Sequence, residues 1–311
     1  MKQIYTFKEL NKIPALTWNW LKMNRANLDV EAESDVISEK KEIVATKPNE
    51  KVSLHFDFED GKTYEHEQII TARENSEITV IMDYSSAENA SGFSKIRTKL
   101  VAEANAKIHL VKVQLLGSDF VQIDDTVGEC ADNAEIKVTQ VELGGAKIFA
   151  QVKNDLNGFM SKFKSHTAYL CKDKQNFDFN YLVNHFGEKS DTRMWIKGVV
   201  DGEATKTYRG TIDFKNGCAE STGDEQEETL LMSPTVINKS IPIILCDEEN
   251  VAGSHGSTIG RLSADELFYM QSRGITEDEA KKMMARAKII SVANQIPDSA
   301  LVEKITTFID K

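Results

Sequence analysis

The feature that most constrains the fold is a period of two in the apolar residues from about Lys51 to Leu245. Apolar residues occupy every second position in several runs: Val52-Leu54-Phe56-Phe58, Val111-Val113-Leu115, Ile148-Ala150-Val152 and Phe177-Phe179-Tyr181-Val183. Such alternation predicts strands with one buried face. Turn-forming pairs such as Asp60-Gly61 and Gly144-Gly145 separate the runs, and no helical periodicity lies between them. The chain is therefore predicted to be mainly β.

Three architectures fit a long series of short strands: a sandwich, a barrel and a β-solenoid. The strands begin at irregular intervals, and the sequence shows no strict repeat. A helix-free series of this length is long for one sandwich but natural for a solenoid, whose coils stack one at a time. The pattern favours the solenoid only somewhat and leaves the other two open.

After Gly260 the apolar period changes to that of a helix. Ser263 with Glu266, and Thr276 with Glu279, form two capping-box starts, and a last helix is predicted to begin near Asp298. The predicted apolar stripe of the second helix is Ala280, Met283, Met284, Ala287 and Ile290, and that of the third is Leu301, Ile305, Phe308 and Ile309. We expect these helices to cap the open end of a β-coil stack, which must be hidden from edge pairing.

The sequence divides into three predicted parts. Residues 1–48 form an N-terminal segment and connector, whose Trp18 and Trp20 predict a short piece docked on a larger body. Residues 49–250 form the β core, and residues 251–311 form a C-terminal helical domain.

Composition limits the class of partner. The chain has 38 basic and 49 acidic residues, a net charge of −11, which argues against nucleic acid and anionic membranes as partners. No segment approaches the roughly 18 apolar residues of a membrane-spanning helix, and the start lacks a signal-peptide pattern. Cys130, Cys171, Cys218 and Cys246 are too dispersed for a zinc motif or a disulfide scaffold. A cytoplasmic protein with reduced thiols is expected.

Two adjoining C-terminal strings carry a family resemblance. They are Gly253-Ser254-His255-Gly256-Ser257-Thr258-Ile259-Gly260-Arg261-Leu262 and Glu266-Leu267-Phe268-Tyr269-Met270-Gln271-Ser272-Arg273-Gly274-Ile275. Together with the runs at 197–204, 208–212 and 226–233, they resemble the SufB/SufD family, and the SufD branch more closely. The resemblance implies a right-handed parallel β-helix core. It also implies a non-enzymatic scaffold for iron–sulfur cluster assembly.

His255 is the leading candidate for a functional residue. Its small neighbours in a predicted Gly/Ser/Thr turn leave the imidazole sterically open, and a neutral imidazole can ligate iron. The resemblance implies that it lies at an interface with SufB, where a transient Fe–S cluster forms. A plain hydrogen bond within the turn is the alternative.

Cys246 and Glu227 are weaker candidates for metal ligands. Many SufD members have a Cys just before the Ser-His-Gly run, where this chain has Gly253. Cys246 could replace it only if the chain folds back, and a packing role is favoured. Glu227 is the position nearest to the cluster-forming Cys of SufB, although exposed acidic pairs such as Glu227-Glu228 are ordinarily just solvated.

The resemblance also implies two protein partners. The C-terminal helices would dock a SufC-like ATPase through Leu267, Phe268, Tyr269, Met283 and Met284, unless this face packs on the chain's own β-stack. The other partner would be SufB or a second copy of the chain. The chain has no phosphate-binding glycine loop of its own.

Two other functions compete. A β-helix polysaccharide lyase or hydrolase would need clustered carboxylates or basic residues on adjacent coils, and an export signal. A purely structural β-solenoid would assemble end to end, which capping helices would oppose.

Overall fold

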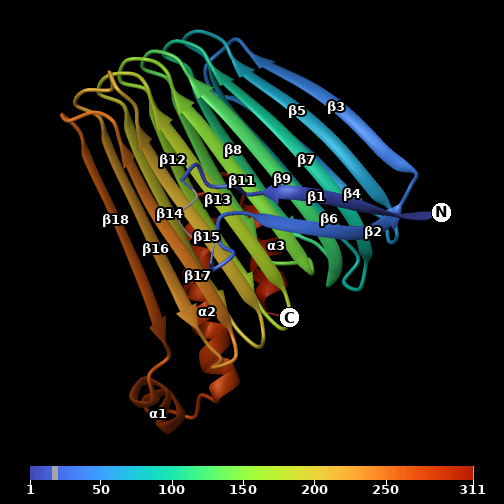
Figure 1. Cartoon of the computed structure of the whole chain (residues 1–311). Helices are drawn as coiled ribbons and strands as arrows, with labels where there is room; N and C mark the ends of the chain where they lie inside the picture. Colours follow the sequence, from blue (N-terminus) through green and yellow to red (C-terminus); the bar gives the residue numbers. More distant parts are fainter. Residues whose placement is uncertain (16–19, 311) are drawn as a thin grey trace.

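The computed structural model describes residues 1–15 and 20–310, and its main body is a parallel β-solenoid of about eight turns (Figure 1). The odd-numbered sheet contains β3 (Val36–Ala45), β5 (Thr63–Ala72), β7 (Ser91–Ala102), β9 (Asp119–Cys130), β11 (Lys147–Leu156), β13 (Asn176–His185), β15 (Thr205–Phe214) and β17 (Ile237–Cys246). The even-numbered sheet contains β4 (Glu50–Phe58), β6 (Glu77–Ser86), β8 (Lys107–Leu115), β10 (Glu135–Glu142), β12 (Lys162–Cys171), β14 (Asp191–Val200), β16 (Thr222–Leu231) and β18 (Ala252–Arg261). The predicted mainly-β solenoid is confirmed. The parallel strands of the solenoid run from Val36 to Arg261, and the division at residues 48 and 250 stays a prediction.

A recurring turn connects the odd-numbered sheet to the even-numbered sheet in six of the coils. Six successive turns from the odd to the even sheet contain a residue with left-handed backbone followed by a buried Ser or Ala: Asn75-Ser76, Asn105-Ala106, Asn133-Ala134, Met160-Ser161, Lys189-Ser190 and Glu220-Ser221. Asn adopts this conformation at little cost. The backbone N–H of Asn105 donates to the carbonyl of Asp132 in the next turn at 2.8 Å, and Asn133 donates likewise to Phe159 at 2.8 Å. The turns thus continue the ladder of the sheets.

The N-terminal segment forms an antiparallel hairpin of β1 (Lys2–Leu10) and β2 (Ala26–Glu33), which crosses the outer face of the odd-numbered sheet (Figure 1). Apolar residues of β2 pack there against Phe93 and Ile123. Buried Arg209 fixes the hairpin, because its Nε donates to the carbonyl of Met23 at 2.7 Å while its guanidinium pairs with Asp178. Trp18 lies outside the described residues.

Three helices follow the last strand: α1 (Ala264–Ser272), α2 (Glu277–Ala293) and α3 (Ser299–Ile309). Both predicted capping boxes are present, with Ser263 on α1 and Thr276 on α2 accepting from the third helical N–H. Asp298 caps α3 by accepting from the backbone N–H of Leu301 at 3.1 Å. Within the described residues, no helix is long and apolar enough to cross a membrane.

The helices do not cap the open end, and this prediction was wrong. Helices α2 and α3 pack on the outer face of the even-numbered sheet against an apolar patch of Ile81, Val111, Val113, Val141 and Leu143. That patch would otherwise meet water, and removing its apolar surface from water stabilises the fold. The predicted stripe of α2 was partly wrong, since Met283 and Ala287 are exposed and the buried residues are Ala280, Ala285, Ile289, Val292 and Ala293. For α3, Leu301, Ile305 and Ile309 are buried as predicted.

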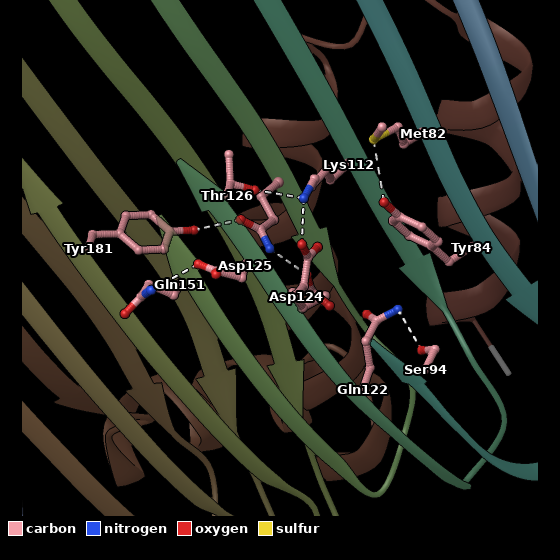
Figure 2. A network of polar contacts seen from close by, with 12 residues as sticks. Met82, Tyr84, Ser94, Lys112, Gln122, Asp124, Asp125, Thr126, Gln151 and Tyr181 are labelled. Carbon is pink, nitrogen blue, oxygen red and sulfur yellow. Dashed lines mark hydrogen bonds and ion pairs between the residues drawn. The ribbon is translucent and has the colours of Figure 1, made fainter. Parts of the chain in front are cut away.

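The middle of the solenoid holds a buried polar network (Figure 2). Lys112 pairs with Asp124 and donates to the hydroxyl of Thr126 at 2.7 Å. Nearby, the amide of Gln140 donates to Glu142 at 2.6 Å. The side chains of Lys112, Asp124 and Glu142 are almost completely buried, so water cannot screen a charge on any of them.

This network makes the stability of the fold depend on pH. Burial raises the pKa of Glu142 from 4.5 to about 8. The unfolded chain therefore releases this proton near pH 4.5 while the folded chain keeps it to about pH 8, so the free energy of unfolding falls as the pH rises through this window. Glu142→Gln should remove up to roughly 4 kcal/mol of that fall. Urea unfolding at pH 5 and pH 8 measures it, with the exposed Glu188→Gln as a control that should leave the slope unchanged.

Candidate functional site at the C-terminal open end

The last coil of the solenoid, β17 and β18, is paired on one side only. Within the described residues, β17 pairs with β15 and β18 pairs with β16, and each strand ends its sheet (Figure 1). His255 lies in the middle of β18, so the predicted turn was wrong. Ten residues of β18 pair in register with Thr222–Leu231, and this ladder outweighs the low strand propensity of the glycines.

The register places His255 on the inward-facing side of β18. It pairs with Glu225, and two residues on Ser257 pairs with Glu227. Glu225 and Glu227 are buried inside the solenoid, and side chains at every second position share a face. His255 therefore faces the solenoid axis, and it is exposed. Gly253, one step earlier on this face, fits closely, since a Cβ there would lie 3.0 Å from the ring of Phe214.

Cys246 reaches the same end from the other sheet. It is the last residue of β17, pairs with the buried Phe214 and is exposed, and its thiol donates to the carbonyl of Glu248 at 3.1 Å. The other three cysteines are buried, and burial raises the pKa of the Cys130 and Cys171 thiols to about 12. Among the described residues Cys246 is thus the one thiol open to solvent, and the packing role favoured for it was wrong.

Glu227 is buried rather than solvated. It is 2% exposed on β16, inside the solenoid and one coil before the end, where it is paired with Lys206 and accepts from the hydroxyls of Ser257 at 3.0 Å and Thr229 at 3.1 Å. Within the described residues, no three His, Cys, Asp or Glu side chains converge on a point where a metal ion could bind. His255, Cys246 and Glu227 therefore do not form a metal centre within one chain.

Sequence reasoning missed Glu225, the buried carboxyl that pairs in register with His255. Burial raises its pKa to about 8. Its carboxyl extends across the interior to Gly210, where a Cβ would lie 2.1 Å from Oε1. The sequence does contain a signal for it, because Glu225 and Glu227 are two positions apart, and in a strand this spacing puts both acids on one face.

The residues predicted to bind a partner are mostly accessible. Phe268 is 73% exposed, Tyr269 is 59% exposed and Met283 is 53% exposed, whereas Leu267 and Met284 are half-buried. No residue of α1 is buried. Helix α1 therefore presents aromatic rings to solvent without a core of its own.

The two ends of the solenoid differ in charge. At the N-terminal end, β3 carries the charged run Glu39-Lys40-Lys41-Glu42, in which Lys41 pairs with Glu39 at 2.8 Å. At the C-terminal end, β17 and β18 carry only Lys239 and Arg261. Charged edge strands resist pairing with other chains. The C-terminal end therefore has fewer charges that oppose strand pairing than the N-terminal end.

Comparisons with known proteins agree with this architecture. A family model described as "SUF system FeS cluster assembly, SufBD core domain" matches residues 57–288. The iron–sulfur cluster assembly protein SufD of Bacillus subtilis (strain 168) is 21% identical over 245 residues, which cover 78% of this chain and 56% of that protein. The SufD of Escherichia coli (strain K12) is 23% identical over 250 residues, covering 79% of this chain and 58% of that protein.

The chain spans little more than half the length of these two SufD proteins. An iron–sulfur cluster assembly SufBD family protein of Galdieria sulphuraria is 26% identical over 171 residues, covering 55% of this chain and 77% of that protein. Members of the matched family are generally non-catalytic assembly components. With most of the solenoid inside the matched region, this chain belongs to the SufBD family of iron–sulfur cluster assembly proteins.

Proposed function

We propose that this chain is a non-enzymatic scaffold subunit of a cytoplasmic Suf-type complex. Its C-terminal open end would pair with a SufB-type protein or with a second copy of the chain, and its helices would bind a SufC-like ATPase. The observation that carries the proposal is that β17 and β18 are each paired on one side only and present His255 at an end whose edge strands carry few charges.

The geometry of this end supports a shared cluster site. The nascent Fe–S cluster is the cargo of the complex, and His255 offers it an accessible imidazole. Among the described residues no complete set of ligands gathers within one chain, and in this proposal the second chain supplies the remaining donors. Cys246 offers a second donor from the same coil, because its thiol is exposed.

The exposed face of α1 supports the ATPase contact. Phe268 and Tyr269 lie on a helix that buries no residue of its own. Exposed aromatic rings of this kind are common anchors of protein interfaces. This surface belongs to the helices, so a SufC-like ATPase bound there would leave β17 and β18 free to pair.

Replacing His255 with alanine tests the proposal. Anaerobic reconstitution of the purified complex with iron and sulfide should give at least tenfold less cluster absorbance, because one ligand is lost while the strands still pair. His55→Ala is the matched control: its imidazole is also exposed but lies in β4 at the opposite end, beside Asp83. Equal cluster absorbance in the wild type and the His255→Ala variant would remove the basis of the proposed function.

A further inference from the structure

We infer that Glu227 is a positioning residue that fastens the terminal coil and thereby sets the place of His255, and that it is not itself a metal ligand. The inference rests on the proposed function of the open end. It concerns four strands, β15 to β18, which meet at this one carboxylate.

Both oxygens of Glu227 are fully occupied by donors of the chain. Oε1 pairs with Lys206 of β15 and accepts from the hydroxyl of Thr229 at 3.1 Å. Oε2 accepts from the hydroxyls of Ser240 in β17 and Ser257 in β18. A metal ion could bind Glu227 only by displacing a buried ammonium group and several hydroxyls. The donors therefore assign it a structural role.

The carboxylate is charged despite its burial. Burial acts to raise the pKa of Glu227, but the Lys206 ammonium and the hydroxyl donors outweigh burial and hold this pKa below its ordinary value. Hydrogen bonds to an ionised acceptor are roughly twice as strong as those between neutral groups. Lys206 is itself held in place between the rings of Tyr169 and Tyr208, at 5.7 and 5.4 Å from their centroids.

The terminal coil needs such a fastening because it has little core. In β17 only Ile241 is buried, and β18 buries no residue. The backbone ladders hold each strand to its own sheet, but Glu227 connects the two strands to each other across the interior. Ser257 is two residues from His255 on the same face of β18, so this hydrogen bond fixes the segment that carries the imidazole.

A charge-balanced double variant separates positioning from folding. Glu227→Leu alone would leave Lys206 buried without a counter-charge and would destabilise the whole protein. Lys206→Met/Glu227→Leu removes both charges while nearly keeping the volume, a change that is often close to neutral for stability. We expect a nearly wild-type unfolding midpoint, at least tenfold faster hydrogen exchange of backbone amides in β17 and β18, and a several-fold loss of cluster absorbance in the reconstituted complex.

Two further variants serve as controls. Lys206→Met/Glu227→Gln keeps an amide oxygen that can accept from Ser240 and Ser257, and it should restore both slow exchange and cluster absorbance. Lys112→Met/Asp124→Leu removes the same type of buried pair from the middle of the solenoid, and it should leave exchange in β17 and β18 unchanged.

The outcomes distinguish this inference from the proposed function. Unchanged exchange in β17 and β18 of Lys206→Met/Glu227→Leu would overturn the inference, whatever His255→Ala does. Faster exchange with wild-type cluster absorbance, in a protein where His255→Ala abolishes that absorbance, would also overturn the positioning role while leaving the proposed function intact. Faster exchange together with a loss of absorbance that the Gln variant restores supports the inference.

Discussion

The Lys112→Met variant is expected to unfold with about 3–5 kcal/mol less free energy than the wild type near pH 8. Lys112 is the cation paired with Asp124, and both side chains are buried within 2% exposure (Figure 2). Removing it leaves Asp124 and Glu142 inside the solenoid without a counter-charge. An uncompensated buried charge costs far more than the pair contributes.

The expected loss of unfolding free energy in Lys112→Met grows as the pH rises. Burial raises the pKa of Asp124, and the Lys112 ammonium opposes that rise. Without the ammonium the pKa of Asp124 rises further, so the folded variant holds protons on Asp124 and Glu142 that the unfolded chain releases above about pH 4 to 5. Stability must then fall more steeply with rising pH than in the wild type. At pH 5 the variant should lose only its hydrogen bonds and some packing.

Denaturant unfolding followed by circular dichroism at pH 5 and pH 8 measures both effects. Lys107→Met is the matched control, because Lys107 lies on the same strand but is exposed, with only a 3.8 Å contact to Glu77. It should change stability by less than about 1 kcal/mol at either pH. A loss in Lys112→Met that is the same at both pH values would show that the buried carboxyls are not the cause.

The period of two identified the strands but could not assign their faces. Val111 and Val113 were read as a buried face, and they are buried, but beneath α2 and α3 on the outside of the solenoid. The interior row of that strand begins with Ile108 and Leu110 but continues with the polar Lys112 and Gln114. When helices cover one face of a strand and the next coils cover the other, apolar alternation no longer marks the core. Only the pairing register reveals which row faces inward.

For a related reason, the repeat of the solenoid is not visible in the sequence. Six successive coils carry a left-handed turn residue before a buried Ser or Ala, but the residue changes from Asn105 and Asn133 to Met160 and Glu220. The later coils share a backbone conformation without sharing the side chain that usually signals it. The small residue is fixed by space in the corner, and either Ser or Ala satisfies that requirement.

The candidate site was predicted in part. The small residues around His255 correctly indicated an accessible imidazole. Its relation to Glu225 and Glu227 could not be predicted, because these residues precede it by a whole coil and meet it only through strand register. The expectation that Glu227 belongs to an exposed, solvated acidic pair was wrong for the same reason, since Glu227 forms an ion pair with Lys206 that crosses from one sheet to the other.

Placing a charge on the C-terminal end should abolish pairing there. Ile259 is 50% exposed in β18, on the same inward-facing side as His255, so a partner strand that extends this coil would cover it. Ile259→Lys would then bury an ammonium group without a counter-charge. A penalty of roughly 3 kcal/mol or more corresponds to at least about a hundredfold weaker association, and the proposed interface should not form at micromolar concentration.

The opposite end of the solenoid provides the matched control for this variant. Ile37 is 44% exposed in β3, the strand that carries the charged run Glu39-Lys40-Lys41-Glu42, so Ile37→Lys adds one more charge to an edge that already resists pairing. Sedimentation velocity of the purified chain, alone and with a co-expressed SufB-type protein, should show the loss of association for Ile259→Lys and wild-type behaviour for Ile37→Lys. Equal effects of the two substitutions, or wild-type association of Ile259→Lys, would mean that β17 and β18 do not form the interface. In that case the exposed imidazole of His255 would face solvent rather than a partner, and the site of cluster assembly would have to lie elsewhere on the chain.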